Sequence, residues 1–195
     1  MPQAITQIEK EASELLGEIE IVRREMQNEK GLLSDAENRI KDIERYYLEA
    51  LLRVGVPGVL ESDRVNIDKQ SWIPKIYPPD GDSYNFYNAG SGGKKTLLNV
   101  CYALAVHQVA TEHNLPLPFF LMIDTPMKNI GEDVNREIFH SFYDFLYSIA
   151  KGTLAQTQFI IIDKEYFPPP QESSLDVYER FMSPDAPLIS YYRGP

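Results

Sequence analysis

The amino-terminal quarter of the chain follows a seven-residue pattern of apolar positions that the rest of the sequence lacks. With Ile5 as heptad position a, the a and d positions are apolar over about seven heptads, and only Glu29 interrupts them. These positions are Ile5, Ile8, Ala12, Leu15, Ile19, Val22, Met26, Glu29, Leu33, Ala36, Ile40, Ile43, Tyr47 and Ala50. No proline lies between Pro2 and Pro57. The pattern predicts a coiled-coil helix over residues 1–54, about 75 Å long at about 1.5 Å per residue.

The apolar seam of such a helix needs a partner. Gly17 and Gly31 each disfavour the helix by about 1 kcal/mol relative to alanine, and a helix in water draws most of its stability from packing. A coiled coil is favoured over a helix lying on a globular core, because few domains of this size offer so long a surface. The chain contains no second heptad segment, so we expect the second helix of the coil to come from elsewhere.

Residues 55–195 have the pattern of an α/β lobe. A turn-rich stretch at 54–58 leads into two short runs, 64–68 and 72–77, whose alternation predicts strands. Proline, aspartate and glycine at 78–82 predict a turn. The lobe is therefore expected to begin with two short strands.

The remainder of the lobe alternates helices with continuous apolar runs. Helices are predicted over 95–112 and 132–151, and strands buried on both faces over 119–123 and 159–162. The buried face of the first helix is predicted to comprise Leu97, Leu98, Cys101, Ala105 and Val109. This alternation predicts a mostly parallel sheet flanked by helices, and the run 188–192 is a candidate last strand.

The charge balance argues against one class of function. The chain has 29 Asp and Glu against 19 Lys and Arg, and this net charge of −10 makes the chain alone a poor candidate for non-specific nucleic-acid binding. The single cysteine, Cys101, cannot form an internal disulfide and is typical of a reducing compartment. The sequence has no apolar run of about 18 residues and no signal-peptide core. We expect a cytoplasmic protein without a membrane partner.

A glycine-rich segment, Gly90–Gly93, lies just before the 95–112 helix. Helix amino termini present free N–H groups, and glycines let the backbone approach a phosphate closely; the Ser91 hydroxyl adds a donor. The segment is not a P-loop, because G-x-x-x-x-G-K-[ST] requires glycine in place of Asn88 and Ser or Thr in place of Lys95. Taken alone, it is either a phosphate cradle or a cap on a packed helix.

Asp124 ends the apolar run 119–123 at the edge of the predicted sheet, where NTPases hold Mg²⁺, usually through water. Apolar strands that end in aspartate are common, so the order of features is more informative than this residue alone. A long coiled-coil helix precedes Ser-Gly-Gly at a helix start, and a buried strand ending in aspartate, another helix and another strand follow.

This order resembles the C-terminal half of the ATPase head in the SMC, RecN and SbcC-like branch of ABC-type ATPases, over roughly residues 1–165. The resemblance implies the C-terminal lobe of such a head behind a coiled-coil helix. It places the ABC signature motif at Ser91, Gly92, Gly93 and Lys94, followed by Lys95 and Thr96. It places the Walker B strand at Leu121, Met122, Ile123 and Asp124, and the D-loop at Asn129, Ile130 and Gly131. The switch position falls at Asp163, Lys164 and Glu165.

Three departures from the family pattern bear on activity. Nothing in the chain corresponds to Walker A, the Q-loop or the ascending helix, which lie in the N-terminal half of such a head. The Walker B aspartate is normally followed by a catalytic glutamate, but here Thr125 and Pro126 follow, as in some divergent members. Threonine has no useful basicity at neutral pH, and Glu132 or a residue of another chain could substitute. No histidine stands at the switch position. Surface or packing roles, and no metal site, are predicted for His107, His113 and His140.

The resemblance implies a composite site, so that the chain is either a fragment of a longer protein or one subunit of a split head. A Walker A lobe would bind the ATP phosphates, and Asp124, with Thr125 beside it, would place Mg²⁺ through water. The signature residues would cap the γ-phosphate of ATP held by a second, opposed head, so ATP would close a dimer of heads. The isolated chain would be inactive. DNA enters as a partner through the family alone, in repair, chromosome maintenance or defence against foreign DNA.

Two other interpretations stay open. The chain could be a coiled-coil interaction protein whose ABC-like head has lost hydrolysis, in keeping with Thr125 and the missing histidine. It could instead be an unrelated α/β enzyme that uses Asp124 and Asp163, at neighbouring strand ends, as an acid–base pair. The second of these accounts for neither the heptads nor the Ser-Gly-Gly segment.

Overall fold

The computed structural model describes residues 2–126 and 136–183. In chain order its elements are α1 (Pro2–Val54), β1 (Arg64–Ile67), β2 (Pro74–Tyr77), α2 (Gly92–Glu112), β3 (Phe120–Asp124), α3 (Arg136–Lys151) and β4 (Gln158–Ile162). The candidate strand at 188–192 and the first residues predicted for the second helix, 132–135, lie outside the described residues. Within the described ranges, no helix is both long and apolar enough to cross a membrane.

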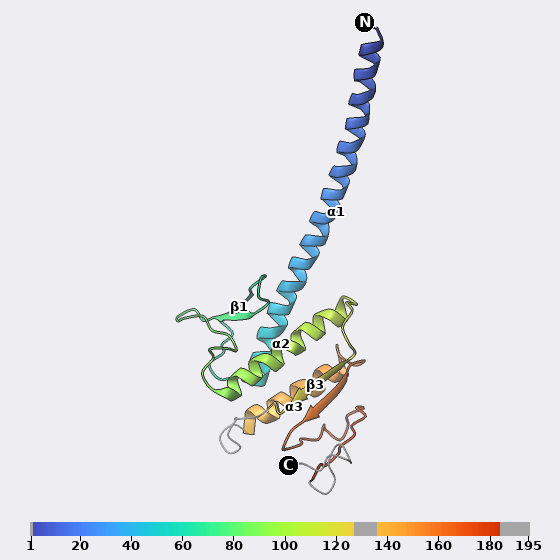
Figure 1. Ribbon diagram of the computed structural model, residues 1–195. Helices are drawn as coiled ribbons and strands as arrows, with labels where there is room; N and C mark the ends of the chain where they lie inside the picture. The colour runs from blue at the N-terminus through green and yellow to red at the C-terminus, as the bar shows by residue number, and fades with distance from the viewer. Residues whose placement is uncertain (1, 127–135, 184–195) are drawn as a thin grey trace, which may run out of the picture.

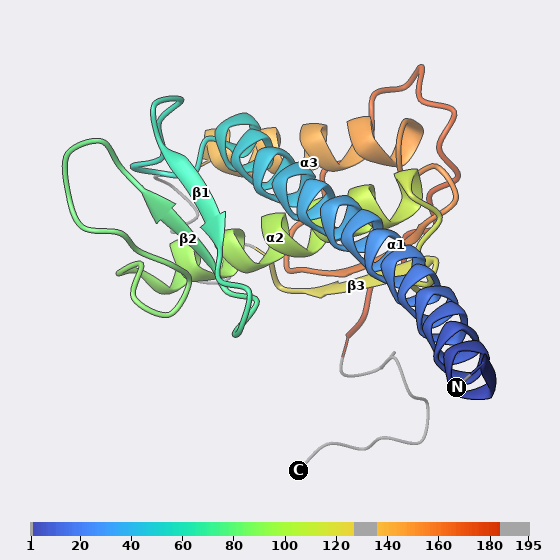
Figure 2. The ribbon, with the colours of Figure 1, turned by 90° about the horizontal axis from the view of Figure 1, so that it is seen from above.

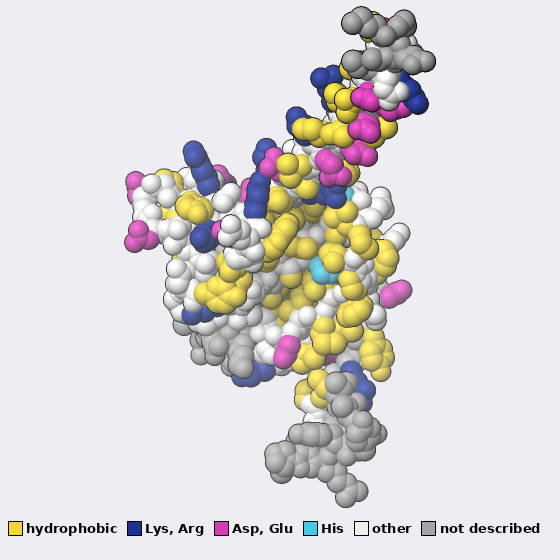
Figure 3. Space-filling view, turned by 45° about the horizontal axis from the view of Figure 1, so that its top comes forward, with side chains coloured by type: hydrophobic (Ala, Val, Ile, Leu, Met, Phe, Trp, Pro, Cys, Tyr) yellow, Lys and Arg dark blue, Asp and Glu magenta, His cyan; other side chains and the backbone are white. Residues whose placement is uncertain are grey.

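The long helix that the heptads predict is present, and its two ends differ in burial. The amino-terminal part of α1 projects from the lobe (Figure 1), and Figure 3 shows hydrophobic side chains among charged ones along it. Leu15 and Met26 of the seam are 58% and 53% exposed. The last turns of α1 cross α2 (Figure 2), where Tyr47, Leu51 and Val54 are fully buried. One seam therefore packs on the lobe at its lower end and continues uncovered above it.

The antiparallel pair β1–β2 lies at the end of the lobe where α2 begins (Figure 2). Glu44 of α1 fixes β1, because its Oε1 accepts a hydrogen bond from Ile67 N at 2.8 Å. Both strands are shorter than predicted at the turn between them. Asp68 leaves the strand to form a turn in which its Oδ1 accepts from Ser71 N at 2.8 Å, and Trp72, with φ 57°, cannot continue a strand.

The α2 helix forms the centre of the lobe. All five residues predicted for its inner face are buried, namely Leu97, Leu98, Cys101, Ala105 and Val109. The helix begins at Gly92 rather than at Lys95, because Ser91 acts as its N-cap. The α3 helix adds Phe142 and Leu146 to the same core.

The strands β3 and β4 pair in parallel, as predicted. Leu121 lies opposite Phe159 and Ile123 opposite Ile161, and these four side chains pack against the core. The β1–β2 pair forms a separate sheet, so the parallel sheet contains two strands within residues 2–126 and 136–183.

The prediction that the run 119–123 is buried on both faces is wrong. Phe119, Phe120 and Met122 are 62%, 51% and 57% exposed, and β4 is only partly buried. In the described part of the chain β3 pairs with β4 alone and helices cover one face, so Phe120 and Met122 on the other face stay more than half exposed. The apolar strand β3 therefore has one face packed on the core and one face exposed to solvent.

Candidate functional site

The amino terminus of α2 has the geometry of an anion-binding helix start. Ser91 is exposed, with an extended backbone, and its Oγ accepts from Lys94 N at 3.3 Å. The first intrahelical bond runs from Lys95 N to Ser91 O at 3.1 Å. The N–H groups of Gly92 and Gly93 precede it and are not used by the helix. A hydroxyl and two backbone donors thus lie at the positive end of the helix dipole, where Ser91 and Gly92 are exposed and Gly93 is buried.

Lys94, the fourth predicted signature residue, directs its side chain toward the turn after α1. Its Nζ lies 4.2 Å from the centroid of the Tyr84 ring and beside Gly58. Burial lowers the pKa of the Lys94 amine, while the nearby Asp63 carboxylate opposes this shift. The backbone N–H of Lys94 therefore binds the capping Ser91, while its ammonium group lies against Tyr84 and Gly58.

Asp124 is exposed at the carboxyl end of β3, and Thr125 holds it. Thr125 Oγ1 donates to Asp124 Oδ1 at 2.6 Å, which leaves Oδ2 available to a ligand. Thr125 has φ 52°, a left-handed conformation that β-branched residues avoid. Its N–H donates to Ile162 O at 2.6 Å, and Pro126 behind it is buried. Backbone strain of this kind persists where the surroundings enforce it, and it concentrates at functional sites.

An open groove runs between α2, from the residues just after the predicted signature motif, and the predicted Walker B strand. From α2 it is lined by Lys95, Thr96, Asn99, Val100 and Ala103. From β3 it is lined by Leu121, Met122, Ile123 and Asp124. The lysine that shares the groove with Asp124 is therefore Lys95 and not Lys94.

The predicted switch residues, Asp163 and Lys164, follow β4 at the same edge of the sheet. Asp124 lies opposite Ile162, so Asp163 is one residue further on and its side chain points to the opposite face. Asp163 Oδ2 is buried, and the Asp163 charge adds to the rise that burial causes in the pKa of Tyr143 on α3. This geometry argues against an acid–base pair formed by Asp124 and Asp163.

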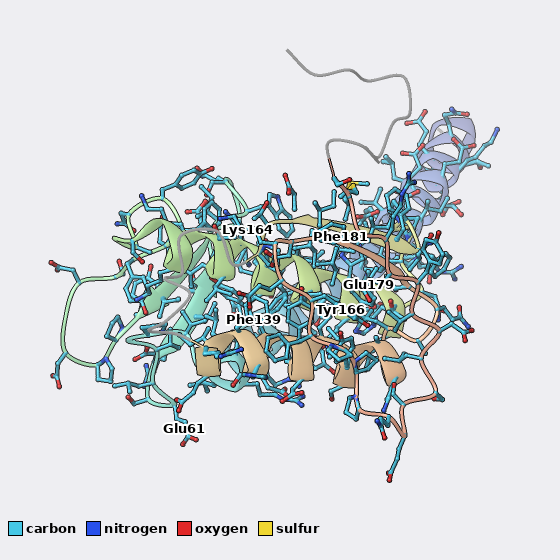
Figure 4. The ribbon with its side chains drawn as sticks, turned by 90° about the horizontal axis from the view of Figure 1, so that it is seen from below. Glu61, Phe139, Lys164, Tyr166, Glu179 and Phe181 are labelled. Carbon is cyan, nitrogen blue, oxygen red and sulfur yellow. The ribbon has the colours of Figure 1, made fainter. Side chains whose placement is uncertain are left out.

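The segment after β4 is anchored on α3. Figure 4 shows it running from Lys164 toward α3, where Phe139 lies. Tyr147 OH donates to Phe167 O, and the Phe139 and Phe167 rings are 4.9 Å apart. The switch position is thereby fixed between β4 and α3.

The three histidines and the cysteine each contact other groups of the folded lobe. His107 contacts the carbonyl one turn earlier in α2 at 3.0 Å, His113 lies 3.7 Å from Asp42, and His140 packs on an aromatic ring. Cys101 is fully buried, and burial raises the pKa of its thiol to about 12, so the thiol stays protonated. The buried Cys101 thiol is therefore not placed to act as a nucleophile.

The site fits Mg²⁺ only as part of a larger assembly. Among residues 2–126 and 136–183, no group of three or more His, Cys, Asp or Glu could hold a metal ion. Asp124 offers one exposed carboxylate, which suits an ion that keeps its waters and takes its other ligands from phosphates. The predicted D-loop residues Asn129, Ile130 and Gly131 lie outside the described part.

Solved structures of SMC heads match this arrangement of a long helix on a small lobe. One comes from work on ATP-driven dimerization and DNA-stimulated activation of SMC ATPases; it is 16% identical over 68% of this chain and 73% of that chain, with a TM-score of 0.45. The fold is similar to that of SMC head domains.

Two further SMC heads are longer than this chain. The Smc head domain of Pyrococcus furiosus, with an extended coiled coil and bound to the C-terminal domain of ScpA, is 20% identical over 63% of this chain, with a TM-score of 0.42. The Smc head domain of Pyrococcus yayanosii, with a coiled coil and joint, is 18% identical over 74% of this chain, with a TM-score of 0.47. The chain covers only 28% and 25% of their lengths. Comparison with protein-family models and with curated proteins finds no match.

The role proposed for each site residue follows from its own geometry. One part of the site was missed by sequence reasoning, namely the surroundings of the Lys94 ammonium. Gly58, Asp63 and Tyr84 form them, and no spacing or repeat in the sequence links these three positions to Lys94.

Proposed function

We propose that the chain is the C-terminal lobe of an SMC-like ATPase head that forms an ATP site only with a Walker A lobe and a second head. The carrying observation is an exposed, serine-capped glycine helix start on α2, whose next residues, Lys95 and Thr96, share a groove with the exposed Asp124 carboxylate. Ser91 and the N–H groups of Gly92 and Gly93 suit a γ-phosphate. We call the chain together with its Walker A lobe the complete head.

Two uncovered apolar surfaces support a second lobe. Leu15, Ile19 and Met26 expose the seam of α1, and Phe120 and Met122 expose the outer face of β3. Side chains of this kind are stabilising only when they are covered. A lobe that contributes a helix along α1 and an element packed on the outer face of β3 would cover both surfaces.

The chemistry assigned to this chain is binding and orientation. Bound Mg²⁺ would neutralise the charge that develops on the transferred phosphoryl group. Asp124 Oδ2 would hold the ion through water, and Thr125 Oγ1 would orient the carboxylate through its bond to Oδ1. Thr125 can position a water molecule but cannot accept its proton. We therefore propose that ATP holds the heads together for long periods and that hydrolysis is slow.

A second candidate function is a head that engages through ATP and never hydrolyses it. The presence of Thr125 where the family carries glutamate specifically favours this candidate. Under either candidate, DNA as a partner and a role in repair, chromosome maintenance or defence come from the resemblance alone. The net charge of −10 gives no support to DNA binding by this chain.

The proposed function is tested by native mass spectrometry of the tagged chain, isolated from its own host with and without Mg-ATP. We expect a polypeptide with a G-x-x-x-x-G-K-[ST] loop, joined to this chain or bound to it, and doubling of the assembly with ATP. A lone chain that ignores ATP would contradict the proposal. A lone chain that binds ATP tightly would contradict it too, because the site would then not be composite.

Thr125→Glu is expected to raise ATP turnover of the complete head by at least about tenfold, because a positioned base contributes about 10²–10⁴-fold to proton transfer. The measurement is phosphate release at saturating Mg-ATP. Thr125→Gln is the matched control, since it has the same size and no basicity. Equal turnover of the Glu and Gln variants would show that the natural threonine does not restrain hydrolysis.

A further inference from the structure

We propose that Lys94 is a positioning residue that ties the phosphate-facing start of α2 to the turn at the foot of α1. The chain then has a direct connection between the coil and the Ser-Gly-Gly segment. The functional consequence rests on the proposed function, whereas the tether is a property of this chain alone.

The two ends of Lys94 belong to different parts of the lobe. Its backbone N–H donates to Ser91 Oγ at 3.3 Å and so holds the capping serine. Its Nζ lies 4.2 Å from the centre of the Tyr84 ring, in a cation–π contact. Lys94 thus links Ser91, the N-cap of α2, to Tyr84, which precedes the glycine-rich segment.

The Lys94 side chain lies against the turn that follows α1. Tyr84 OH donates to Gly58 O at 3.1 Å. Gly58 has φ 73°, and a Cβ placed there would lie 3.5 Å from Lys94 Nζ. The ammonium therefore sits directly against the backbone of this turn. Glycine suits the position because its conformation is left-handed.

The buried carboxylate of Asp63 stabilises the Lys94 ammonium in this position. Asp63 is 4% exposed, and its Oδ2 accepts from Leu60 N at 3.1 Å. No hydrogen bond reaches its Oδ1 from any described residue. The electrostatic attraction of Asp63 for Lys94 counteracts the cost of burying the amine. Loss of the positive charge would leave Asp63 without this compensation.

The turn is hydrogen-bonded to the end of α1. Val56 N donates to Leu51 O at 3.0 Å and Gly55 N donates to Leu52 O at 3.1 Å, so the turn continues the hydrogen bonding of the helix end. Val56 is 3% exposed and belongs to the main core. A displacement of the foot of α1 would therefore reach Lys94 through Gly58 and Tyr84.

Hydrogen–deuterium exchange of the full chain tests the tether, with Lys94→Met as the variant because it keeps the apolar stem and loses the charge. We expect about tenfold faster exchange in two segments, 54–63 and 92–98, as loss of a desolvated cation–π contact predicts. Peptides from α3 are the internal reference and should not change. Lys94→Arg should restore slow exchange in both segments, because it keeps a cation over Tyr84.

Lys95→Met is the matched control, since Lys95 is adjacent in sequence but lines the groove beside Asp124. It should leave exchange at 54–63 unchanged. Equal exchange in the two methionine variants, or no rescue by arginine, would overturn the tether.

The complete head gives the functional readout. There Lys94→Met should raise the ATP concentration for half-maximal engagement by about tenfold, and Lys94→Arg should restore it. Normal exchange with lost engagement would overturn the proposal, because Lys94 would then be a direct phosphate ligand. A wild-type complete head that never engages with ATP would refute the proposed function, and the exchange data would still decide the tether.

Discussion

Ser91→Arg is expected to abolish ATP-driven engagement of the complete head while leaving the lobe folded. Ser91 is exposed at the start of α2, so a larger side chain displaces nothing from the core. The long side chain would occupy the place of the opposed γ-phosphate and block the N–H groups of Gly92 and Gly93. Loss of the N-cap costs about 1 kcal/mol, which lowers the melting temperature by only about 2–4 °C. Analytical ultracentrifugation with and without Mg-ATP measures the engagement.

Two smaller substitutions separate capping from phosphate binding. Asparagine and aspartate cap helices about as well as serine, so Ser91→Asn and Ser91→Asp should both keep the melting temperature. Only Ser91→Asp places a negative charge against the γ-phosphate, and it should weaken engagement strongly relative to Ser91→Asn. Engagement that survives both Ser91→Arg and Ser91→Asp would remove Ser91 from the ATP site.

The helices were predictable because their patterns are local. The heptads give α1 almost to the residue, and the apolar stripe of α2 gives its buried face. The β3 run misled because a sequence records that a strand is apolar and not which chain covers it. Phe120 and Met122 read as core residues, yet in this chain they face solvent. An apolar strand is compatible with burial inside its own chain and with burial by a partner, and the sequence pattern does not distinguish the two.

The candidate site was predictable in position and not in orientation. Ser91 lies at a helix start and Asp124 at a strand end, as the local pattern predicts. The direction of the Lys94 side chain depends on Tyr84 and Gly58, which meet it only in the folded lobe. The left-handed backbone of Thr125 is likewise set by its bond to β4, and its residue type would have predicted the opposite.

Asp124→Asn is expected to lower Mg²⁺-dependent ATP turnover of the complete head by on the order of 10²–10³-fold, as for other single electrostatic groups in active sites. The amide keeps the shape of the side chain and can still accept from Thr125 Oγ1, so the fold and the strand end should persist. It has no negative charge with which to hold hydrated Mg²⁺. Phosphate release across a Mg²⁺ titration measures the effect, and the apparent Mg²⁺ requirement should rise along with the loss of rate.

Asp144→Asn is the matched control for this substitution, because Asp144 is an exposed carboxylate on α3. It should leave both turnover and the Mg²⁺ requirement unchanged. Engagement by Mg-ATP should survive Asp124→Asn better than turnover does, since the signature residues that close the heads are intact. Unchanged turnover in Asp124→Asn would show that β3 is not a Walker B strand. Activity of the isolated wild-type chain, lost in Asp124→Asn, would instead indicate an enzyme that needs no second lobe.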